Sequence, residues 1–331
     1  MEHLNIGVIG VGHLGSLHAK MLAEIRDVSL VGVYDIDHQK AVRIAAEFNS
    51  VSYPDVDTLI ASSDAVTIAT PTTTHAEVAR KAIDRGKHVF IEKPITQSIA
   101  EGSELCRLAA DRSVLIQVGH IERFNPAILA LEKYEIKPMF VESHRLAQFN
   151  PRGTDVAVVL DLMIHDIDII LSFVKFPVAR VDANGVAVVS DSVDIANARL
   201  QFENGCVANV TASRISQRKM RKMRLFQKNE YISIDFSEGQ AEVFRLIGED
   251  EEPHAKGTLM LGELGSGKHK RRIVYEQPEV KEVNALKHEL ELFARAIREK
   301  TTPIVSGEDG KRALEVAHII MERISQQTIR M

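Results

Sequence analysis

The chain has 331 residues, of which 45% are hydrophobic and 26% are charged. These proportions are typical of a folded globular protein and exclude a disordered or fibrous one. The formal net charge of -5 excludes a general attraction to nucleic acid or to an anionic membrane. The length exceeds that of one ordinary hydrophobic core, so two domains are expected.

Targeting and redox signals favour a cytoplasmic protein. The opening residues MEHLNIGVIG lack the basic and long apolar regions of a signal peptide. No apolar run reaches the roughly 18 residues that a membrane-spanning helix needs. The two cysteines, Cys106 and Cys206, lie far apart and without metal-ligand spacing. A disulfide between them is geometrically possible, but a reduced cytoplasmic protein with no metal site is the favoured interpretation.

The first 120 residues alternate between short apolar runs, which predict strands, and amphipathic runs, which predict helices. Expected strands cover 5–10, 30–35, 65–70, 88–93 and 114–120, the last three taken as the fourth, fifth and sixth. Expected helices cover about 13–26, 38–48, 75–86 and 98–112. The pattern predicts an α/β domain over 1–120, a doubly wound parallel sheet of the Rossmann type. Ligands of this fold bind at the carboxyl ends of the strands.

The first strand-to-helix turn reads GVGHLG and has G-x-G-x-x-G spacing. Gly10 permits a tight turn, Gly12 lets the backbone approach a pyrophosphate, and Gly15 lets the helix lie close to the sheet. His13 and Leu14 lie inside the turn and are counted with it as candidate cofactor-binding residues. The alternative is a glycine-rich turn that binds no ligand.

Polar residues follow the next two strand ends. Asp35 comes 20 residues after Gly15, where a carboxylate accepts a hydrogen bond from the adenine ribose. The segment ATPTTTH follows the expected fourth strand and makes Thr70, Pro71 and His75 candidate neighbours of the nicotinamide ribose. A plain turn before a helix is the structural alternative for this segment.

The fifth expected strand, HVFIEKP, ends in Glu92 and Lys93. In a dinucleotide-binding fold these residues emerge at the crevice where nicotinamide and substrate meet. For an isolated lysine, a solvated strand end would be the simpler explanation.

The glycine turn, Asp35, the T-P-x-x-x-H segment and the E-K-P segment together resemble the glucose-fructose oxidoreductase, inositol dehydrogenase and MocA family. The resemblance implies a nicotinamide-dependent oxidoreductase that acts on a sugar or cyclitol. It implies that Lys93 contacts substrate and cofactor, and that Pro94 follows a cis peptide bond. NAD is the expected cofactor, because Asp35 would repel the 2′-phosphate of NADP and Ile36 and Asp37 supply no arginine.

Residues 121–331 are expected to form a substrate-binding and oligomerisation domain. Consecutive strand signals without intervening helices predict an α+β domain with a large, mostly antiparallel open sheet. The expected strands are 140–149, 178–189, 193–202, 206–213, 221–227, 230–236 and 240–246, with helices at 155–173, 281–300 and 308–327. The resemblance covers nearly the whole chain. In that family the outer face of the sheet commonly forms a subunit interface, which implies a homodimer or homotetramer.

The segment DLMIHDID carries the second candidate catalytic group. On an α-helix Asp161 and His165 are four residues apart and share one face, so the carboxylate can orient the imidazole as a general base. The alternative is an exposed pair of little energetic value. The resemblance implies the catalytic pair, because the family has D-x-x-x-H on this helix facing the lysine. Many members carry glycines where this chain has residues 158–160, Val-Val-Leu.

Two further segments narrow the substrate. VGHIERFNP places Arg123 and Asn125 as candidate substrate-binding residues, although Asn125 before Pro126 is also a plausible helix start. Together with SHRLAQFNPRGTD and VVLDLMIHDIDI, this segment is similar to the sequences of dehydrogenases that oxidise the 3-hydroxyl of UDP-N-acetylglucosamine or its uronic acid. The predicted function is therefore NAD-dependent oxidation of a UDP-sugar. The alternatives are a free cyclitol or hexose dehydrogenase and a non-catalytic redox sensor.

Two charged segments have more than one interpretation. RISQRKMRKMR holds six cations, which form either a solvated turn or a diphosphate site; they are Arg214, Arg218, Lys219, Arg221, Lys222 and Arg224. Arg152 is a further candidate for a diphosphate contact. GELGSGK at 262–268 matches the start of a phosphate loop, but His269 stands where serine or threonine is required. Whether Lys93 or His165 is the formal base stays open.

Overall fold

The computed structural model describes residues 3–150, 156–248, 250–254, 257–265 and 270–328. The chain divides into two compact units. The first unit comprises Met1–Ile121 and Asn284–Leu314, and the second comprises Glu122–Val283 and Glu315–Met331. The sequence predicted one domain boundary, after residue 120. The structure instead assigns residues 284–314, far along the chain, to the first unit.

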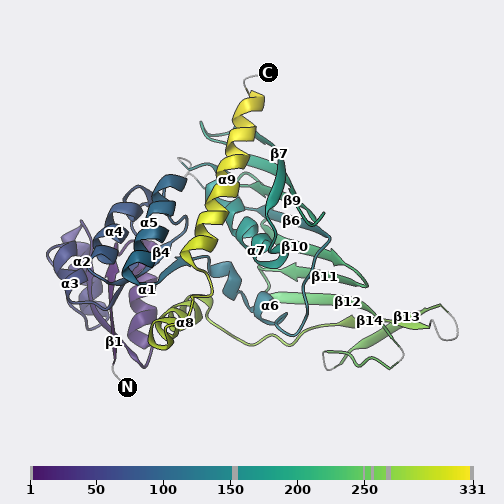
Figure 1. Cartoon of the computed structure of the whole chain (residues 1–331), viewed down its shortest axis with the longest axis horizontal. Helices are drawn as coiled ribbons and strands as arrows, with labels where there is room; N and C mark the ends of the chain where they lie inside the picture. The colour runs from purple at the N-terminus through teal and green to yellow at the C-terminus, as the bar shows by residue number, and fades with distance from the viewer. Residues whose placement is uncertain (1–2, 151–155, 249, 255–256, 266–269, 329–331) are drawn as a thin grey trace. The chain divides into compact units, whose positions relative to one another are not determined.

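The first unit contains a five-stranded sheet in which every neighbouring pair is parallel (Figure 1). The strand order is β2 (Val28–Tyr34), β1 (Leu4–Ile9), β3 (Ala65–Ile68), β4 (His88–Glu92) and β5 (Ile116–Gly119). Its helices are α1 (His13–Glu24), α2 (His38–Glu47), α3 (Val56–Ala61), α4 (His75–Asp84), α5 (Ile99–Arg112) and α8 (Ala285–Glu299). The short 3-10 helix η1 (Thr72–Thr74) precedes α4. The expected Rossmann arrangement is confirmed.

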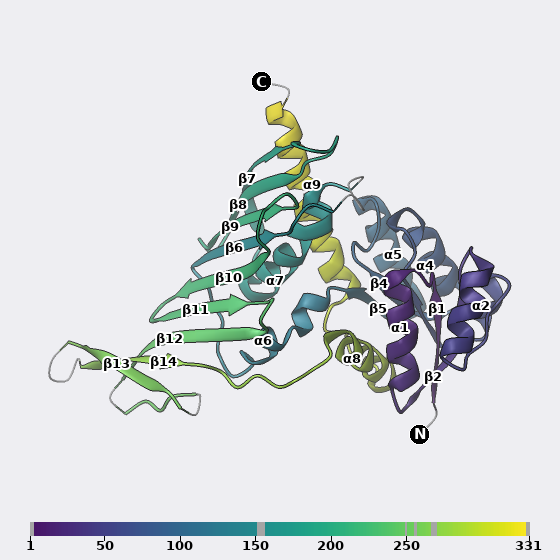
Figure 2. The ribbon, with the colours of Figure 1, turned by 180° about the vertical axis from the view of Figure 1, so that it is seen from behind.

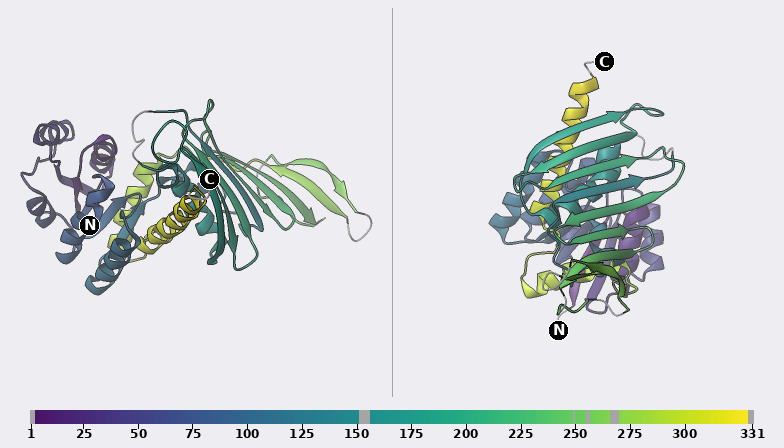
Figure 3. Two further views of the ribbon diagram at one scale, coloured as in Figure 1. Left: turned by 90° about the horizontal axis from the view of Figure 1, so that it is seen from above. Right: turned by 90° about the vertical axis from the view of Figure 1, so that its right-hand side faces the viewer.

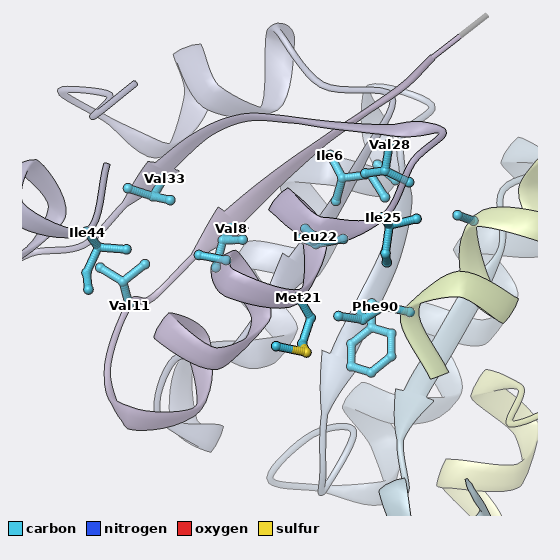
Figure 4. Packing of buried hydrophobic residues seen from close by; sticks show 14 of the residues in the cluster. Ile6, Val8, Val11, Met21, Leu22, Ile25, Val28, Val33, Ile44 and Phe90 are labelled. Carbon is cyan, nitrogen blue, oxygen red and sulfur yellow. The ribbon is translucent and has the colours of Figure 1, made fainter. Parts of the chain in front are cut away.

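One face of this sheet is buried by α1, α2 and α8. Ile6, Val8 and Phe90 from the strands lie in one buried cluster with Leu22 of α1 and Phe293 of α8. Figure 4 shows the strand and α1 side chains of this cluster pointing toward one another. Helix α8 belongs to this unit because its apolar face completes the cluster, a contact that its distance along the chain hides.

The opposite face is covered by α3 and α4, with α5 beside α4. Gly7 alternates with Ile6 and Val8 and therefore points to this second face. A β-carbon at Gly7 would lie 2.8 Å from Leu59 of α3, so glycine is needed for the close approach. Helices on both faces leave the carboxyl ends of the strands as the place for ligands.

The second unit contains a nine-stranded sheet (Figure 2). Its order is β13 (Leu259–Leu264), β14 (Arg271–Glu276), β12 (Gln240–Gly248), β11 (Glu230–Asp235), β10 (Met220–Gln227), β6 (Phe140–Leu146), β9 (Val207–Ser213), β8 (Ile195–Phe202) and β7 (Val178–Val186). Only the pair β6–β9 is parallel among these described strands. The expected large, mostly antiparallel sheet is confirmed.

One face of the nine-stranded sheet is covered by α7 (Ile164–Val174) and the second half of α9 (Gly307–Thr328), as Figure 3 shows. Arg145 of β6 is hydrogen-bonded to Asp166 of α7, and a β-carbon at Gly185 of β7 would lie 2.9 Å from Ile324 of α9. Alternation along the strands then divides residues between this inner face and an outer face. No helix of the described second unit lies on the outer face. The short helices η2 (Ile121–Phe124) and α6 (Pro126–Leu129) lead into β6.

Several expected elements need correction. The first sheet has five strands rather than six, because the segment after α2 contributes only an isolated bridge between Val33 and Ser52. The helix expected at 155–173 begins with a π-helical turn, η3 (Val159–Met163), before α7; residue 155 lies outside the described part. Strands β13 and β14 were not expected, because nearly every β13 residue is exposed and its sequence shows no alternation.

The sequence already argued against a phosphate loop at 262–268, and the described part of this segment has a different structure from one. Gly262 lies within β13, and the next described element after it is the strand β14, whereas a phosphate loop leads into a helix. Residues 266–269 lie outside the described part of the chain. Among the described helices, none is long and apolar enough to cross a bilayer.

Candidate functional site

The glycine turn between β1 and α1 has the geometry of a dinucleotide-binding turn. Gly10 has φ of +84°, and a β-carbon at Gly15 would lie 1.8 Å from the carbonyl oxygen of Gly10. A β-carbon at Gly12 would meet no atom within 4 Å, so the space above the turn is open. His13 and Leu14 form the first exposed turn of α1, which has no side-chain cap and no acidic residue. Its backbone N–H groups therefore suit an anionic pyrophosphate.

Asp35 is fixed beside this turn. Its two carboxylate oxygens accept hydrogen bonds from the backbone N–H groups of Val11, at 2.7 Å, and Asp37, at 2.9 Å. Each carboxylate oxygen can accept a second hydrogen bond, so both remain available to ribose hydroxyls. The turn and Asp35 together fit the adenosine half of NAD.

His75 has a different position from the one expected. Its side chain is buried, with Nδ1 2.9 Å from the carbonyl oxygen of Pro94 and Nε2 2.9 Å from that of Thr70. Burial lowers the pKa of His75, although both carbonyl contacts oppose this. The ring lies between these two carbonyl groups, and its one N–H in the neutral form donates to one of them, so His75 holds two turns together rather than lying open to a cofactor. Thr70, whose hydroxyl accepts from Thr74, and the exposed Pro71 stay candidates for cofactor contact.

Lys93 directly follows β4, next to the turn that follows β3. The Lys93–Pro94 peptide bond is cis, as the resemblance implied. Glu92 is hydrogen-bonded through Oε1 to Nε2 of His18 at 2.9 Å, and its Oε2 accepts from the backbone N–H of Lys93 at 3.3 Å. His18 lies in α1 and was not predicted as a site residue. The sequence shows only an acidic residue beside a lysine at a strand end, and this does not predict that Glu92 will bond to the buried His18.

Asp161 and His165 lie at the start of the helix that packs on β6 and β9. Asp161 is within the π-helical turn η3, and His165 is in the first turn of α7. Both side chains are partly exposed. The sequence predicted both residues on one face of a regular α-helix. The structure has a wider, π-helical turn at Asp161, and such turns are frequent at functional sites.

Arg123 and Asn125 are bonded within the second unit. Arg123 donates two hydrogen bonds to Asp168, at 2.7 and 2.6 Å. Asn125 caps α6 by accepting from Ala127, and its amide donates to Glu122 and to the Phe236 carbonyl. These contacts favour the structural alternative for both residues over a substrate contact.

A buried ionic network anchors the helix that carries His165. The Arg145 guanidinium, on β6, donates to Asp166 of α7 at 2.6 Å and to Glu122 at 2.7 Å. Burial opposes the charge of Arg145, but the two carboxylates raise its pKa above the ordinary value. Sequence reasoning missed this network. Two acids in an otherwise apolar helix, Asp166 and Asp168, were the available signal, since buried carboxylates need cations.

The basic segment divides between the faces of the second sheet. Arg221 lies opposite Arg145 and so belongs to the inner face, whereas Lys222 and Arg224 point to the outer face and pair with Asp235 and Glu142. The buried Arg214 donates to backbone carbonyls and lies 3.8 Å from Asp194. Within the described part of the chain, Arg218 and Lys219 have no ion pair, and Arg152 lies outside it.

Comparison with known proteins gives matches in both units. The model of an oxidoreductase family with an NAD-binding Rossmann fold matches residues 4–120, and the GFO/IDH/MocA C-terminal domain model matches residues 140–242. UDP-N-acetylglucosamine 3-dehydrogenase of Acidithiobacillus ferrooxidans is 37% identical over 318 residues, 96% of each chain. The chain belongs to the Gfo/Idh/MocA oxidoreductase family. Its Rossmann unit is therefore an NAD-binding domain, and the protein is a dehydrogenase.

Other relatives and structures agree with this family membership. The scyllo-inositol 2-dehydrogenase (NAD(+)) of Bacillus subtilis is 30% identical over 236 residues, 65% of this chain and 69% of that protein. A solved structure of the A. ferrooxidans UDP-N-acetylglucosamine 3-dehydrogenase covers 98% of both chains with a TM-score of 0.86 and 36% identity. At 20% identity and a TM-score of 0.77, scyllo-inositol dehydrogenase from Lactobacillus casei shares the fold.

Proposed function

We propose that this family member oxidises the 3-hydroxyl of UDP-N-acetylglucosamine, or of a closely related UDP-sugar, to a ketone. The observation that carries the proposal is the 37% identity over 96% of both chains with a UDP-N-acetylglucosamine 3-dehydrogenase. The inositol dehydrogenase of B. subtilis matches less of this chain, at lower identity. A cytoplasmic location is part of the proposal, since the reaction needs free NAD and a nucleotide sugar.

The proposed catalytic roles belong to three side chains. NAD, when bound, would supply the acceptor for the hydride of the sugar carbon. His165 takes the hydroxyl proton, and Asp161 orients its imidazole. The ammonium of Lys93 positions the hydroxyl oxygen and stabilises the negative charge that develops on it. Gly10, Gly12, Gly15 and Asp35 would hold the adenosine diphosphate half of NAD, by the geometry of their turn.

The diphosphate of a UDP-sugar requires cations, because a diphosphate partly removed from water must be paired. The inner face of the second sheet carries Arg221, whose side chain is 53% exposed and lies 3.6 Å from Glu122. Arg218 and Lys219 precede β10 and are exposed. We assign the diphosphate to Arg218, Lys219 and Arg221, because the outer-face cations lie on the side of the sheet away from α7.

A substrate screen tests the nucleotide-sugar assignment. We expect reduction of NAD with UDP-N-acetylglucosamine and little or none with myo-inositol or glucose. The KM for the UDP-sugar should rise with salt, because exposed charge pairs are screened over about 10 Å at 0.1 M ionic strength. Activity on the free polyols without activity on UDP-N-acetylhexosamines would overturn the assignment. Binding of NAD without turnover of any sugar would favour a redox sensor.

Cofactor preference tests the placement of Asp35. We expect tighter binding of NAD than of NADP, because a 2′-phosphate would lie beside the carboxylate that already accepts from Val11 and Asp37. Titration of both oxidised cofactors, followed by fluorescence or calorimetry, measures the ratio. Asp35→Ser should reduce the preference by weakening NAD binding and relieving the repulsion. Equal binding of the two cofactors by the unaltered protein would contradict this placement.

We also propose a homodimer or homotetramer. A row of aromatic side chains crosses the outer face from β6 to β14, with ring centroids 5.0–5.9 Å apart; it consists of Phe140, Phe226, Tyr231, Phe244 and Tyr275. A neighbouring row alternates in charge, with Arg224 beside Glu142 and Arg199 opposite Asp182. An apolar row beside an alternating row of charges is self-complementary, which suits a second copy of the same face.

A further inference from the structure

His18 is a buried histidine with one described side-chain hydrogen bond. Its side chain is fully buried in α1, and the edge of its ring contacts Phe90, with centroids 5.2 Å apart. Phe90 in turn contacts Phe293 of α8 at 5.8 Å. Nε2 bonds to Glu92, whereas Nδ1 is buried and has no partner among the described residues. The packing fixes the orientation of the His18 ring, so that its hydrogen-bonded nitrogen, Nε2, points at Glu92.

The Glu92 carboxylate is held from three sides. Oε1 bonds to His18, Oε2 accepts from the backbone N–H of Lys93, and the group lies against Gly119 of β5. A β-carbon at Gly119 would come within 2.9–3.1 Å of the carboxyl atoms, so this arrangement requires glycine there. The carboxylate therefore has one well-defined position, directly before Lys93.

The charge of Glu92 depends on this environment. Burial on its own would raise the pKa of Glu92, but the hydrogen bond from His18 and the charges of His18 and Lys93 lower it below the ordinary value. The group is therefore a carboxylate at neutral pH and is protonated only as the pH falls below its ordinary range. Without the His18 bond, burial would act with less opposition and the pKa would rise.

We infer that His18 is a positioning residue for Lys93, acting through Glu92. By holding an ionised carboxylate at this position, His18 keeps the neighbouring lysine in its charged form and in place. This inference rests on the proposed function only in its claim that Lys93 acts on the substrate hydroxyl. A simple core histidine would contribute packing alone and would leave the protonation of Lys93 unchanged.

Titration of Lys93 by NMR, in protein with 13C-labelled lysine side chains, tests the inference without substrate. The Lys93 resonance is assigned by its loss in Lys93→Arg. In His18→Leu we expect Lys93 to titrate about one pH unit lower than in the unaltered protein, because the Glu92 carboxylate is no longer held in place beside it. In His18→Gln, whose amide can donate to Glu92 from a similar position, the titration should return toward the original value. Turnover with the UDP-sugar should fall about tenfold in His18→Leu and recover in His18→Gln.

Controls separate positioning from packing. Leu22→Val, on the same buried helix face but away from Glu92, should lower thermal stability without moving the Lys93 titration. If His18→Leu does not fold, Glu92→Gln removes the carboxylate charge directly and should produce the same shift. An unchanged Lys93 titration in folded His18→Leu or in Glu92→Gln overturns the inference. Normal turnover of Lys93→Met would instead refute the catalytic proposal, while the titration would still test His18.

Discussion

Replacing Lys93 by methionine or His165 by alanine is expected to lower turnover by roughly two to four orders of magnitude, the usual effect of removing an acid-base group. NAD binding should remain nearly intact, because the glycine turn and Asp35, which hold the adenosine half, are not altered. Asp161→Asn should have a smaller effect if Asp161 only orients His165. Steady-state kinetics and NAD titration of each variant provide the two measurements.

A matched control is available for the lysine. Lys81 is a partly exposed lysine in the last turn of α4 that pairs with Glu77, so Lys81→Met removes a similar side chain near the amino end of β4 rather than its carboxyl end. It should leave turnover unchanged. Near-normal turnover in Lys93→Met, with the control behaving as expected, would remove Lys93 from the catalytic proposal. An equal loss in Asp161→Asn and His165→Ala would show that Asp161 does more than orient the imidazole.

Arg145→Met is expected to destabilise the second unit by about 3–5 kcal/mol. The variant leaves the buried carboxylates of Asp166 and Glu122 without their shared cation, and removing one partner of a buried ionic group has this magnitude. Asn125 and Arg221 contact Glu122 and compensate part of its charge, whereas Asp166 has no such second contact in the described hydrogen bonds and ion pairs. Urea unfolding followed by circular dichroism measures the loss.

An exposed ion pair supplies the comparison. Lys137 pairs with Glu135 in the segment before β6, with side chains 75% and 77% exposed. Exposed pairs contribute about 0–1 kcal/mol, so Lys137→Met should be close to neutral. A loss below about 1 kcal/mol for Arg145→Met, no larger than that of the control, would mean that the network does not anchor α7. Normal stability together with reduced turnover would mean that Arg145 only positions His165.

The first sheet could be predicted in detail because its signals are local. Short apolar strands and amphipathic helices alternate, and Gly10 and Gly15 of the turn have steric requirements that follow from their spacing. The strand patterns then placed Asp35 and Lys93 at the carboxyl ends of two expected strands, and they follow β2 and β4 in the structure. The assignment of His75 went beyond these signals, because a histidine after a strand gives no indication of which carbonyl groups will surround it.

Long-range packing decided the features that were missed. Helix α8 follows a long run of second-unit strands, yet Leu290 and Phe293 complete the core around Phe90. Strand β13 lacks alternation because neither of its faces is buried within the described chain, so its sequence contains no strand period. The π-helical turn packs on β9, and no residue pattern at 159–163 marks it.

For the candidate site, the sequence by itself determined which groups are available: a dinucleotide turn, a lysine at a strand end and an Asp–His pair on one helix. Only the tertiary structure decided how each group is supported. It directed Arg123 to Asp168, Arg221 to the inner face and Lys222 to the outer face, and it placed His18 against Glu92. The physical reason is that charge and hydrogen-bonding capacity belong to a residue, whereas burial and partners arise only when distant segments meet.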